Sequence, residues 1–337
     1  MGNKEKYLLE VKGLKKSFDV SEGWLKRKKQ YLRAVDGVDL YVKEGETLGI
    51  VGESGCGKST TGNLIMHLLE PTEGEIIFDG INLSTLSPEE LRKKRADIQM
   101  IFQDPFSSLN PRMRVFDIIA EPLLTHNVAK GKKLEEKVYE LMDVVGLDRS
   151  YSRRYPHEFS GGQRQRIGIA RAIALKPKLV VCDEPVSALD VSIQSQILNL
   201  LAKLQKEFNL TFIFIAHGLP AVKHISDRIA VMYLGQVVEL ATKEQLFRMP
   251  MHPYTEGLLS AVPIPDPTLR DKKQLVVLEG DMPSPANPPS GCRFHTRCPY
   301  ADVKCKEEVP QLIEKDDGHQ VACHYPLVEG QGIVVNS

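Results

Sequence analysis

Hydrophobic residues are grouped along the chain into short continuous runs and into longer stretches with helical spacing. Apolar runs of strand length occur at Thr47–Val51, Leu179–Cys182 and Leu210–Ala216. Such runs are typical of strands that are buried on both faces. Helix-compatible stretches lie between them, among them Thr60–Leu69 and Val115–Leu124. The pattern therefore predicts buried strands that alternate with helices.

A glycine-rich loop follows the first of these strands. Residues 52–59 read GESGCGKS, which satisfies the pattern G-x-x-x-x-G-K-[ST] between a strand and a helix. The glycines allow backbone N–H groups to surround an anion, and the helix that follows adds its positive end. We expect Lys58 to reach the β- and γ-phosphates of a nucleoside triphosphate and Ser59 to bind Mg²⁺. The other loop residues expected to contact the nucleotide are Gly52, Ser54, Gly55, Cys56, Gly57 and Thr60, with Cys56 in a variable position and without a redox role.

Polar side chains follow the second and third strands. Asp183 and Glu184 come directly after Leu179–Cys182, where charge is costly unless a metal ion or hydrogen bonds compensate it. An acid at this position can hold Mg²⁺ through water, and the next acid can polarise an attacking water. His217 follows Leu210–Ala216. A lone histidine there is more often structural, but beside the other two strands it is a candidate γ-phosphate sensor.

A second anion receptor is predicted between these strands. Residues 159–163 read FSGGQ and run directly into the helical pattern of residues 164–172. A Gly-Gly turn before a helix presents N–H groups to an anion. Because the chain already contains one phosphate loop, we expect this segment to complete the site of a partner molecule.

Taken together, these motifs resemble those of the ATPase subunits of ABC transporters. The shared segments are GESGCGKS at 52–59, Gln103 in IFQDP, FSGGQRQR at 159–166, LVVCDEP at 179–185, SALD at 187–190 and His217. The resemblance covers about the first 250 residues. It implies an α/β P-loop NTPase fold, with a RecA-like core, an antiparallel sheet at the N-terminal edge and a helical subdomain at about residues 104–165. We expect this nucleotide-binding domain to span residues 1–255.

The resemblance also implies roles for individual residues. Glu184 is expected to act as general base, His217 to hold the γ-phosphate, and Gln103 to contact Mg²⁺ and the water. The adenine is expected to stack on Phe18, with Tyr31 as the alternative. Gly218 departs from the family, in which an aspartate often follows the histidine.

Two such subunits would enclose two ATP molecules head to tail. The signature segment of each subunit would close over the ATP of the other, and the residues concerned are Ser160, Gly161, Gly162 and Gln163. Asp190 would lie at the seam between the subunits.

Two further segments narrow the resemblance to one subfamily. QDPFSSLNPR at 103–112 and GCRFHTRCP at 291–299 resemble the ATPases of oligopeptide/dipeptide importers, a subfamily that also takes up nickel and some glycans. The implied partners are a second ABC ATPase subunit, two transmembrane permeases and an extracytoplasmic solute-binding protein. The chain would then be peripheral, at the cytoplasmic face of the cell membrane. The solute, and whether the second ATPase is a different chain or a copy, stay open.

The C-terminal region is rich in cysteine. After a proline-rich stretch at Pro263–Pro289, four cysteines occur with five, six and seventeen intervening residues: Cys292, Cys298, Cys305 and Cys323. This spacing predicts a four-thiolate metal site without identifying the metal. The resemblance to peptide-permease ATPases points to a [4Fe–4S] cluster in a domain spanning residues 256–337. A structural Zn²⁺ and buried free thiols are the alternatives.

Composition limits the remaining possibilities. Lysine plus arginine and aspartate plus glutamate each total 44, so the net charge is zero and no overall basic field favours nucleic acid. No apolar run has the length needed to span a bilayer, and no secretory signal is predicted. The basic run Lys26–Lys29 beside Trp24 is either a solvated loop or a contact with anionic lipid.

Two rival functions remain. A non-transport soluble ABC ATPase of DNA repair or translation would require two cassettes, a long coiled-coil insertion or a basic surface. A nucleotide-binding regulatory partner that does not hydrolyse ATP is disfavoured by Glu184, His217 and the FSGGQ segment.

Overall fold

The computed structural model describes residues 6–21, 30–261 and 280–328. The basic run Lys26–Lys29 with Trp24, and residues 263–279 of the proline-rich stretch, lie outside the described residues. The chain forms two compact units. The first comprises Met1–Tyr7, Val42–Thr47 and Thr85–Ala216, and the second comprises Leu8–Tyr41, Leu48–Ser84 and His217–Ser337. The predicted boundary at residue 255 stays a prediction.

Three parallel strands form the sheet of the first unit: β6 (Ile98–Ile101), β7 (Leu179–Asp183) and β8 (Thr211–Ala216). Ile98 is paired with Leu179, and Val180 is paired with Phe212. Every residue of β7 and β8 is buried, as their continuous apolar sequences predict. The predicted strand Leu179–Cys182 is thus confirmed and continues for one residue, which places Asp183 inside the strand.

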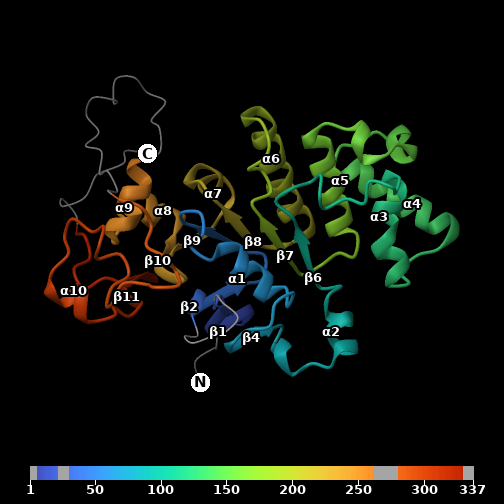
Figure 1. The fold of residues 1–337 in the computed structure, drawn as a ribbon. Helices are drawn as coiled ribbons and strands as arrows, with labels where there is room; N and C mark the ends of the chain where they lie inside the picture. The colour runs from blue at the N-terminus through green and yellow to red at the C-terminus, as the bar shows by residue number, and fades with distance from the viewer. Residues whose placement is uncertain (1–5, 22–29, 262–279, 329–337) are drawn as a thin grey trace, which may run out of the picture. The chain divides into compact units, whose positions relative to one another are not determined.

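The first unit also contains helices (Figure 1). They are α2 (Pro88–Lys94), α3 (Val115–Thr125), α4 (Gly131–Val144), α5 (Gly161–Ile173), α6 (Val191–Phe208) and two short 3₁₀ segments, Arg149–Arg153 and Pro156–Glu158. Helix α3 packs against α4 and α5, and α5 packs against α6. The amphipathic stretch predicted from Val115 is therefore a helix whose apolar face is used in packing.

The second unit contains an antiparallel sheet with the strand order β2-β1-β4-β5. Its strands are β1 (Tyr7–Asp19), β2 (Tyr31–Lys43), β4 (Glu73–Phe78) and β5 (Ile81–Asn82), and a 3₁₀ turn follows at Leu83–Thr85. Leu9 is paired with Phe78 and Val11 with Ile76, so buried apolar side chains occupy one face of β1 and β4. This is the antiparallel sheet that the resemblance implied.

A second set of strands in this unit has the order β11-β12-β10-β9-β3. The strands are β3 (Thr47–Val51), β9 (Arg228–Tyr233), β10 (Gln236–Thr242), β11 (Ile313–Asp316) and β12 (His319–Val321). Strands β3 and β9 are parallel, and β10 is antiparallel to both β9 and β12. The helices of the unit are α1 (Lys58–Ile65), α7 (Leu219–Ile225), α8 (Lys243–Arg248), α9 (Pro253–Ser260) and α10 (Val303–Glu307).

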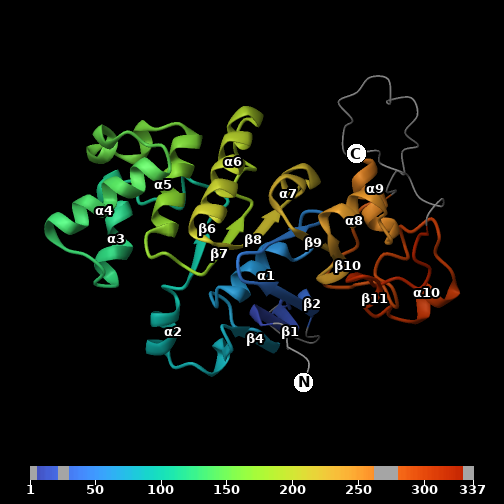
Figure 2. The same cartoon turned by 180° about the vertical axis from the view of Figure 1, so that it is seen from behind.

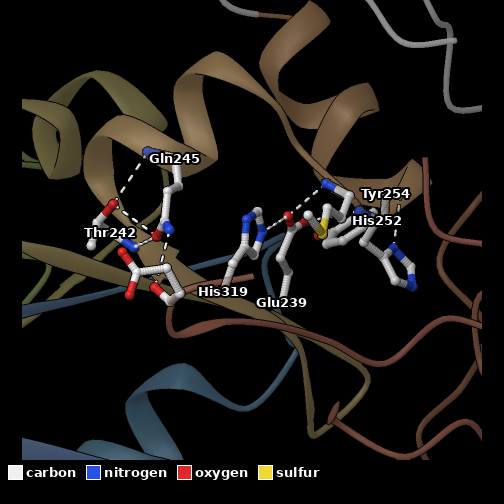
Figure 3. Close-up of polar contacts among 8 residues, drawn as sticks. Glu239, Thr242, Gln245, His252, Tyr254 and His319 are labelled. Carbon is white, nitrogen blue, oxygen red and sulfur yellow. Dashed lines mark hydrogen bonds and ion pairs between the residues drawn. The ribbon is translucent and has the colours of Figure 1, made fainter. Parts of the chain in front are cut away.

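The C-terminal strands add to the edge of this sheet rather than forming a sheet of their own (Figure 2). Glu239 of β10 is paired with Val321 of β12. Its side chain is fully buried, and its carboxylate accepts hydrogen bonds from the backbone N–H groups of Met251 at 2.7 Å and His252 at 3.0 Å. His319 Nε2 lies 2.7 Å from the same carboxylate. Figure 3 shows Glu239 between His319 and the segment that leads into α9.

Three polar contacts on the buried Glu239 side chain thus join β10 to β12 and to the segment before α9. A buried carboxylate is tolerated only when its oxygens are satisfied in this way. His252 is also buried, and its Nδ1 accepts the N–H of Tyr254 at 3.0 Å. Burial lowers the pKa of His252 to about 4, so this imidazole is neutral near pH 7.

None of the helices within the described residues combines the length and the apolarity that are required to cross a membrane.

Candidate nucleotide-binding site

The glycine-rich loop joins the end of β3 to the start of α1. Gly55 and Gly57 have φ angles of 81° and 105°, in the region that favours glycine. A Cβ atom on Gly57 would lie 2.2 Å from the carbonyl oxygen of Ala34, on the neighbouring strand β2. Residue 57 must therefore be glycine both for its backbone angle and because another strand passes close to it.

Lys58 is the first residue of α1 and is almost completely buried. Its Nζ donates to the carbonyl oxygens of Gly52 at 2.7 Å and Glu53 at 3.0 Å. These contacts hold the ammonium group over the loop that precedes it. The next residues, Ser59 and Thr60, lie in the first turn of the same helix.

The thiol of Cys56 is buried beneath the loop. Burial raises its pKa above the ordinary value, so the neutral form is favoured. The absence of a redox role for Cys56 stays a prediction.

The two carboxylates predicted to serve the site, Asp183 and Glu184, lie at the carboxyl end of β7. Asp183 is buried, and Glu184 follows it with a left-handed φ of 46°. The N–H of Glu184 donates to the carbonyl oxygen of Ile215 at 2.9 Å, which fixes this turn against β8. Left-handed backbone at a non-glycine residue costs energy and is found where surrounding structure holds it.

Gln103 lies next to Glu184 although the two are separated by 81 positions in the sequence. Its Nε2 donates to Glu184 Oε2 at 2.9 Å. The amide is therefore oriented with its oxygen, Oε1, left as the acceptor. The sequence predicted that both residues serve one site, and the structure places them in contact.

The signature segment begins α5. The Oγ of Ser160 accepts the N–H of Gln163 at 3.4 Å, and Gln163 Oε1 accepts the N–H of Ser160 at 3.1 Å. This reciprocal pair is a capping box, as Ser160 before the helical pattern predicted. A Cβ atom on Gly162 would lie 2.5 Å from Ile193 Cγ2 of α6. The sequence alone did not show that Gly162 is required for this close packing of helices.

The remaining predicted residues lie at element boundaries. His217 is exposed and follows the last residue of β8. Asp190 is exposed and precedes α6. Phe18 lies near the end of β1 with the Lys16 ammonium 5.3 Å from its ring centre, and the exposed Tyr31 begins β2.

The glycine-rich loop and His217 belong to the second unit, whereas Gln103, Asp183, Glu184, the signature segment and Asp190 belong to the first.

Sequence reasoning missed two contacts of Glu53, which occupies a variable position of the loop. Its N–H donates to Tyr254 Oη at 2.9 Å, and its carboxylate accepts two hydrogen bonds from Arg297. Both partners are more than two hundred positions away in the sequence, and no local pattern indicates either contact.

The four C-terminal cysteines line one cavity, together with His252, His295 and His324. All four are free thiols. Burial, with a smaller contribution from neighbouring cysteines, raises the pKa of Cys298 to about 11 and that of Cys323 to about 12. A metal would therefore have to displace thiol protons on binding.

No preformed metal centre is present in residues 6–21, 30–261 and 280–328, because no group of three or more His, Cys, Asp or Glu side chains there is arranged to hold a metal ion. The four thiols share a cavity, and the expected iron–sulfur domain stays a prediction.

Comparisons with known proteins agree with the motifs. The family model described as ABC transporter matches residues 35–187, and the model described as oligopeptide/dipeptide transporter, C-terminal region, matches residues 238–305. The oligopeptide transport ATP-binding protein AppF of Bacillus subtilis is 56% identical over 318 residues, which cover 94% of this chain and 97% of AppF. The chain belongs to the family of ABC-transporter ATP-binding proteins.

Another relative of this ABC protein is the oligopeptide transport ATP-binding protein OppF of Escherichia coli. It is 55% identical over 321 residues, which cover 94% of the chain and 96% of OppF. Among solved structures, the ATP-binding cassette MJ0796 in a dimeric post-hydrolysis state with ADP and Pi is similar, with a TM-score of 0.63 and 31% identity. The match covers 70% of the chain and 98% of MJ0796. The predicted ABC ATPase fold is therefore confirmed.

Proposed function

We propose that this chain is the ATP-hydrolysing subunit of an ABC importer for oligopeptides or dipeptides. The observation that carries the proposal is the identity of 54 to 56% with oligopeptide transport ATP-binding proteins over nearly the whole of each chain. The C-terminal match at residues 238–305 supports the same subfamily. Import of nickel or another solute by the same subfamily is the second candidate.

In the proposed mechanism, the loop residues hold the triphosphate. Backbone N–H groups of Ser54–Gly57 and the Lys58 ammonium bind the β- and γ-phosphates, whereas the N–H of Glu53 is donated to Tyr254 Oη. Mg²⁺, when bound, would neutralise phosphate charge, and its ligands would be Ser59, the Oε1 of Gln103 and, through water, Asp183. Phe18, with Tyr31 as the alternative, would stack on the adenine.

Glu184 is the proposed general base. Its carboxylate accepts a hydrogen bond from Gln103, which fixes one oxygen and leaves the other to take a proton from water. His217 would hold the γ-phosphate. The segment Ser160–Gln163 would close over the ATP of the partner ATPase, with Asp190 at the seam.

The proposed partners are a second ABC ATPase, two transmembrane permeases and an extracytoplasmic solute-binding protein. The chain would act at the cytoplasmic face of the membrane. A tagged pull-down from native membranes in mild detergent, followed by mass spectrometry, tests this assignment. We expect two polytopic permeases and a second ATPase to co-purify. Recovery of the chain alone, or with ribosomes or DNA, would contradict the transport function and favour a soluble ABC ATPase.

We further propose that Cys292, Cys298, Cys305 and Cys323 hold a [4Fe–4S] cluster. The donor chemistry fits, because four thiols line one cavity and four thiolates are the ligands that such a cluster requires, and the side chains would have to move together to bind it. The segment has little apolar core of its own, so the bound group would mainly stabilise its fold.

Replacing Cys298 by serine is expected to remove a broad absorbance at about 400 nm from anaerobically purified protein. Loss of one of four ligands would release or destabilise the cluster. Cys182→Ala is the matched control, because Cys182 is a buried thiol of β7, and it should leave the spectrum unchanged. Colourless wild-type protein with stoichiometric zinc would replace the cluster by Zn²⁺, and colourless protein without metal would leave four free thiols.

A further inference from the structure

The side chain of Arg297 forms a forked ion pair with Glu53 of the glycine-rich loop. Its Nη1 lies 2.7 Å from Glu53 Oε2, and its Nη2 lies 3.1 Å from Glu53 Oε1. Only 6% of the Arg297 side chain is exposed, compared with 29% for Glu53. Two parallel N–H···O bonds to one carboxylate fix its orientation as well as its charge.

A second contact holds the backbone of the same loop residue. The N–H of Glu53 donates to Tyr254 Oη at 2.9 Å, and Tyr254 is fully buried. The Tyr254 ring packs against Phe294 with centroids 5.4 Å apart, and Phe294 packs against Tyr233 at 5.3 Å. Phe294 and Arg297 belong to the same short segment between Cys292 and Cys298. That segment therefore fixes both the backbone and the carboxylate of Glu53.

A third contact of this segment reaches the other end of the loop. Arg293 donates to the carbonyl oxygen of Leu234 and pairs with Asp36. Gly235, which follows Leu234 in the sequence, donates its N–H to the carbonyl oxygen of Cys56 at 2.8 Å. Residues 293–297 thus support the glycine-rich loop at two separate places.

The negative charge of Glu53 would disfavour an anionic ligand if Arg297 did not pair with it. A carboxylate within a loop that receives a triphosphate repels that ligand, and the repulsion is strong when the carboxylate is partly shielded from water. Arg297 neutralises this charge and donates a hydrogen bond to each carboxylate oxygen. Without Arg297, the carboxylate would be unpaired and free to turn toward the phosphates.

We propose that Arg297 is a positioning residue for ATP binding, which acts by fixing and neutralising Glu53 in the glycine-rich loop. The C-terminal segment thereby contributes to the nucleotide site of its own chain. The inference rests on the proposed role of this loop in ATP binding.

The test measures the dissociation constant of a fluorescent ATP analogue for the full-length chain. Arg297→Met is expected to weaken binding by about tenfold or more, because it leaves Glu53 unpaired. In the double variant with Glu53→Gln, binding should return to within about threefold of the wild type, because no charge then needs a partner. A purely structural role for Arg297 would not give this recovery.

Turnover in the assembled importer gives a second measurement. Arg297→Met should raise the KM for ATP by about tenfold and leave kcat within about twofold, because the partners of Arg297 described above and its ring neighbour Tyr233 are not proposed to act in the chemical step. Arg149→Met is the matched control, since Arg149 also forms a forked pair, with the exposed Asp143. It should change neither the affinity nor the KM.

Equal weakening by Arg297→Met in the wild-type and Glu53→Gln backgrounds would overturn the proposal, as would wild-type affinity of Arg297→Met. If Arg297→Met does not fold, Arg297→Lys carries the test, because it keeps the charge and loses the fork. It should weaken binding, again only when Glu53 is present. Lys58→Ala tests the proposed role of the loop separately from that of Arg297. If Lys58→Ala binds ATP like the wild type, the loop does not bind ATP as proposed, whatever the result for Arg297.

Discussion

Replacing Glu184 by glutamine is expected to lower ATP turnover by at least about a hundredfold while ATP binding is retained. Glutamine has the same size and can still accept the hydrogen bond that Gln103 Nε2 now makes to Glu184 at 2.9 Å. It cannot take a proton from the attacking water. The left-handed backbone of residue 184 is held by its own N–H bond to Ile215, which the substitution does not touch.

Two measurements are required for this prediction. Phosphate release from the assembled importer gives turnover, and a fluorescent ATP analogue gives the affinity of the full-length chain. Glu207→Gln is the matched control, because Glu207 is an exposed carboxylate of α6 that pairs with Lys203 at 3.7 Å. It should turn over ATP like the wild type. Near-wild-type hydrolysis by Glu184→Gln would show that Glu184 is not the base of a working site.

Replacing Gly57 by alanine is expected to reduce nucleotide affinity by at least about a hundredfold, as measured with the same fluorescent analogue. The added Cβ would lie 2.2 Å from the carbonyl oxygen of Ala34, a distance that real Cβ atoms essentially never show. The φ of 105° is also strained for any residue with a side chain. The loop would have to change its path, and its N–H groups would no longer converge on the phosphates.

Gly80→Ala is the control for a strained positive φ without a steric clash. Gly80 also has a positive φ, of 77°, but a Cβ there would meet no atom within 4 Å. It lies in the turn between β4 and β5, outside the glycine-rich loop, so backbone strain there does not move the N–H groups proposed to bind the phosphates. We expect a modest loss of stability and unchanged affinity. Tight binding by Gly57→Ala would show that the loop adapts to the added atom and would contradict the prediction.

Strands and helix starts could be predicted from the sequence where residues close together in the chain determine them. The strand Thr47–Val51 was predicted at its observed bounds, and Ser160 with Gln163 forms the cap that begins α5. The helix predicted over Thr60–Leu69 instead begins at Lys58 and ends at Ile65. It ends early because His67 has a left-handed φ of 51°, which apolar periodicity does not reveal.

The candidate site was predicted as a set of residues but not as a set of contacts. The motif order was enough to name Gln103 and Glu184 as members of one site, and the hydrogen bond between them depends on where β6 and β7 end. No local pattern indicated where the C-terminal strands pair. β12 pairs with β10, and Glu239, His319 and the segment before α9 satisfy one another's polar groups.

The sequence by itself determined the family, the phosphate-binding loop, the carboxylates after β7 and the group of four cysteines, because each is written in residues that are close together in the chain. Only the tertiary structure decided that Arg297 pairs with Glu53 across 244 positions and that the strand carrying Ala34 excludes any side chain from residue 57. Such contacts depend on the path of the folded chain, and local periodicity carries no information about which distant segment will pass close to a given residue.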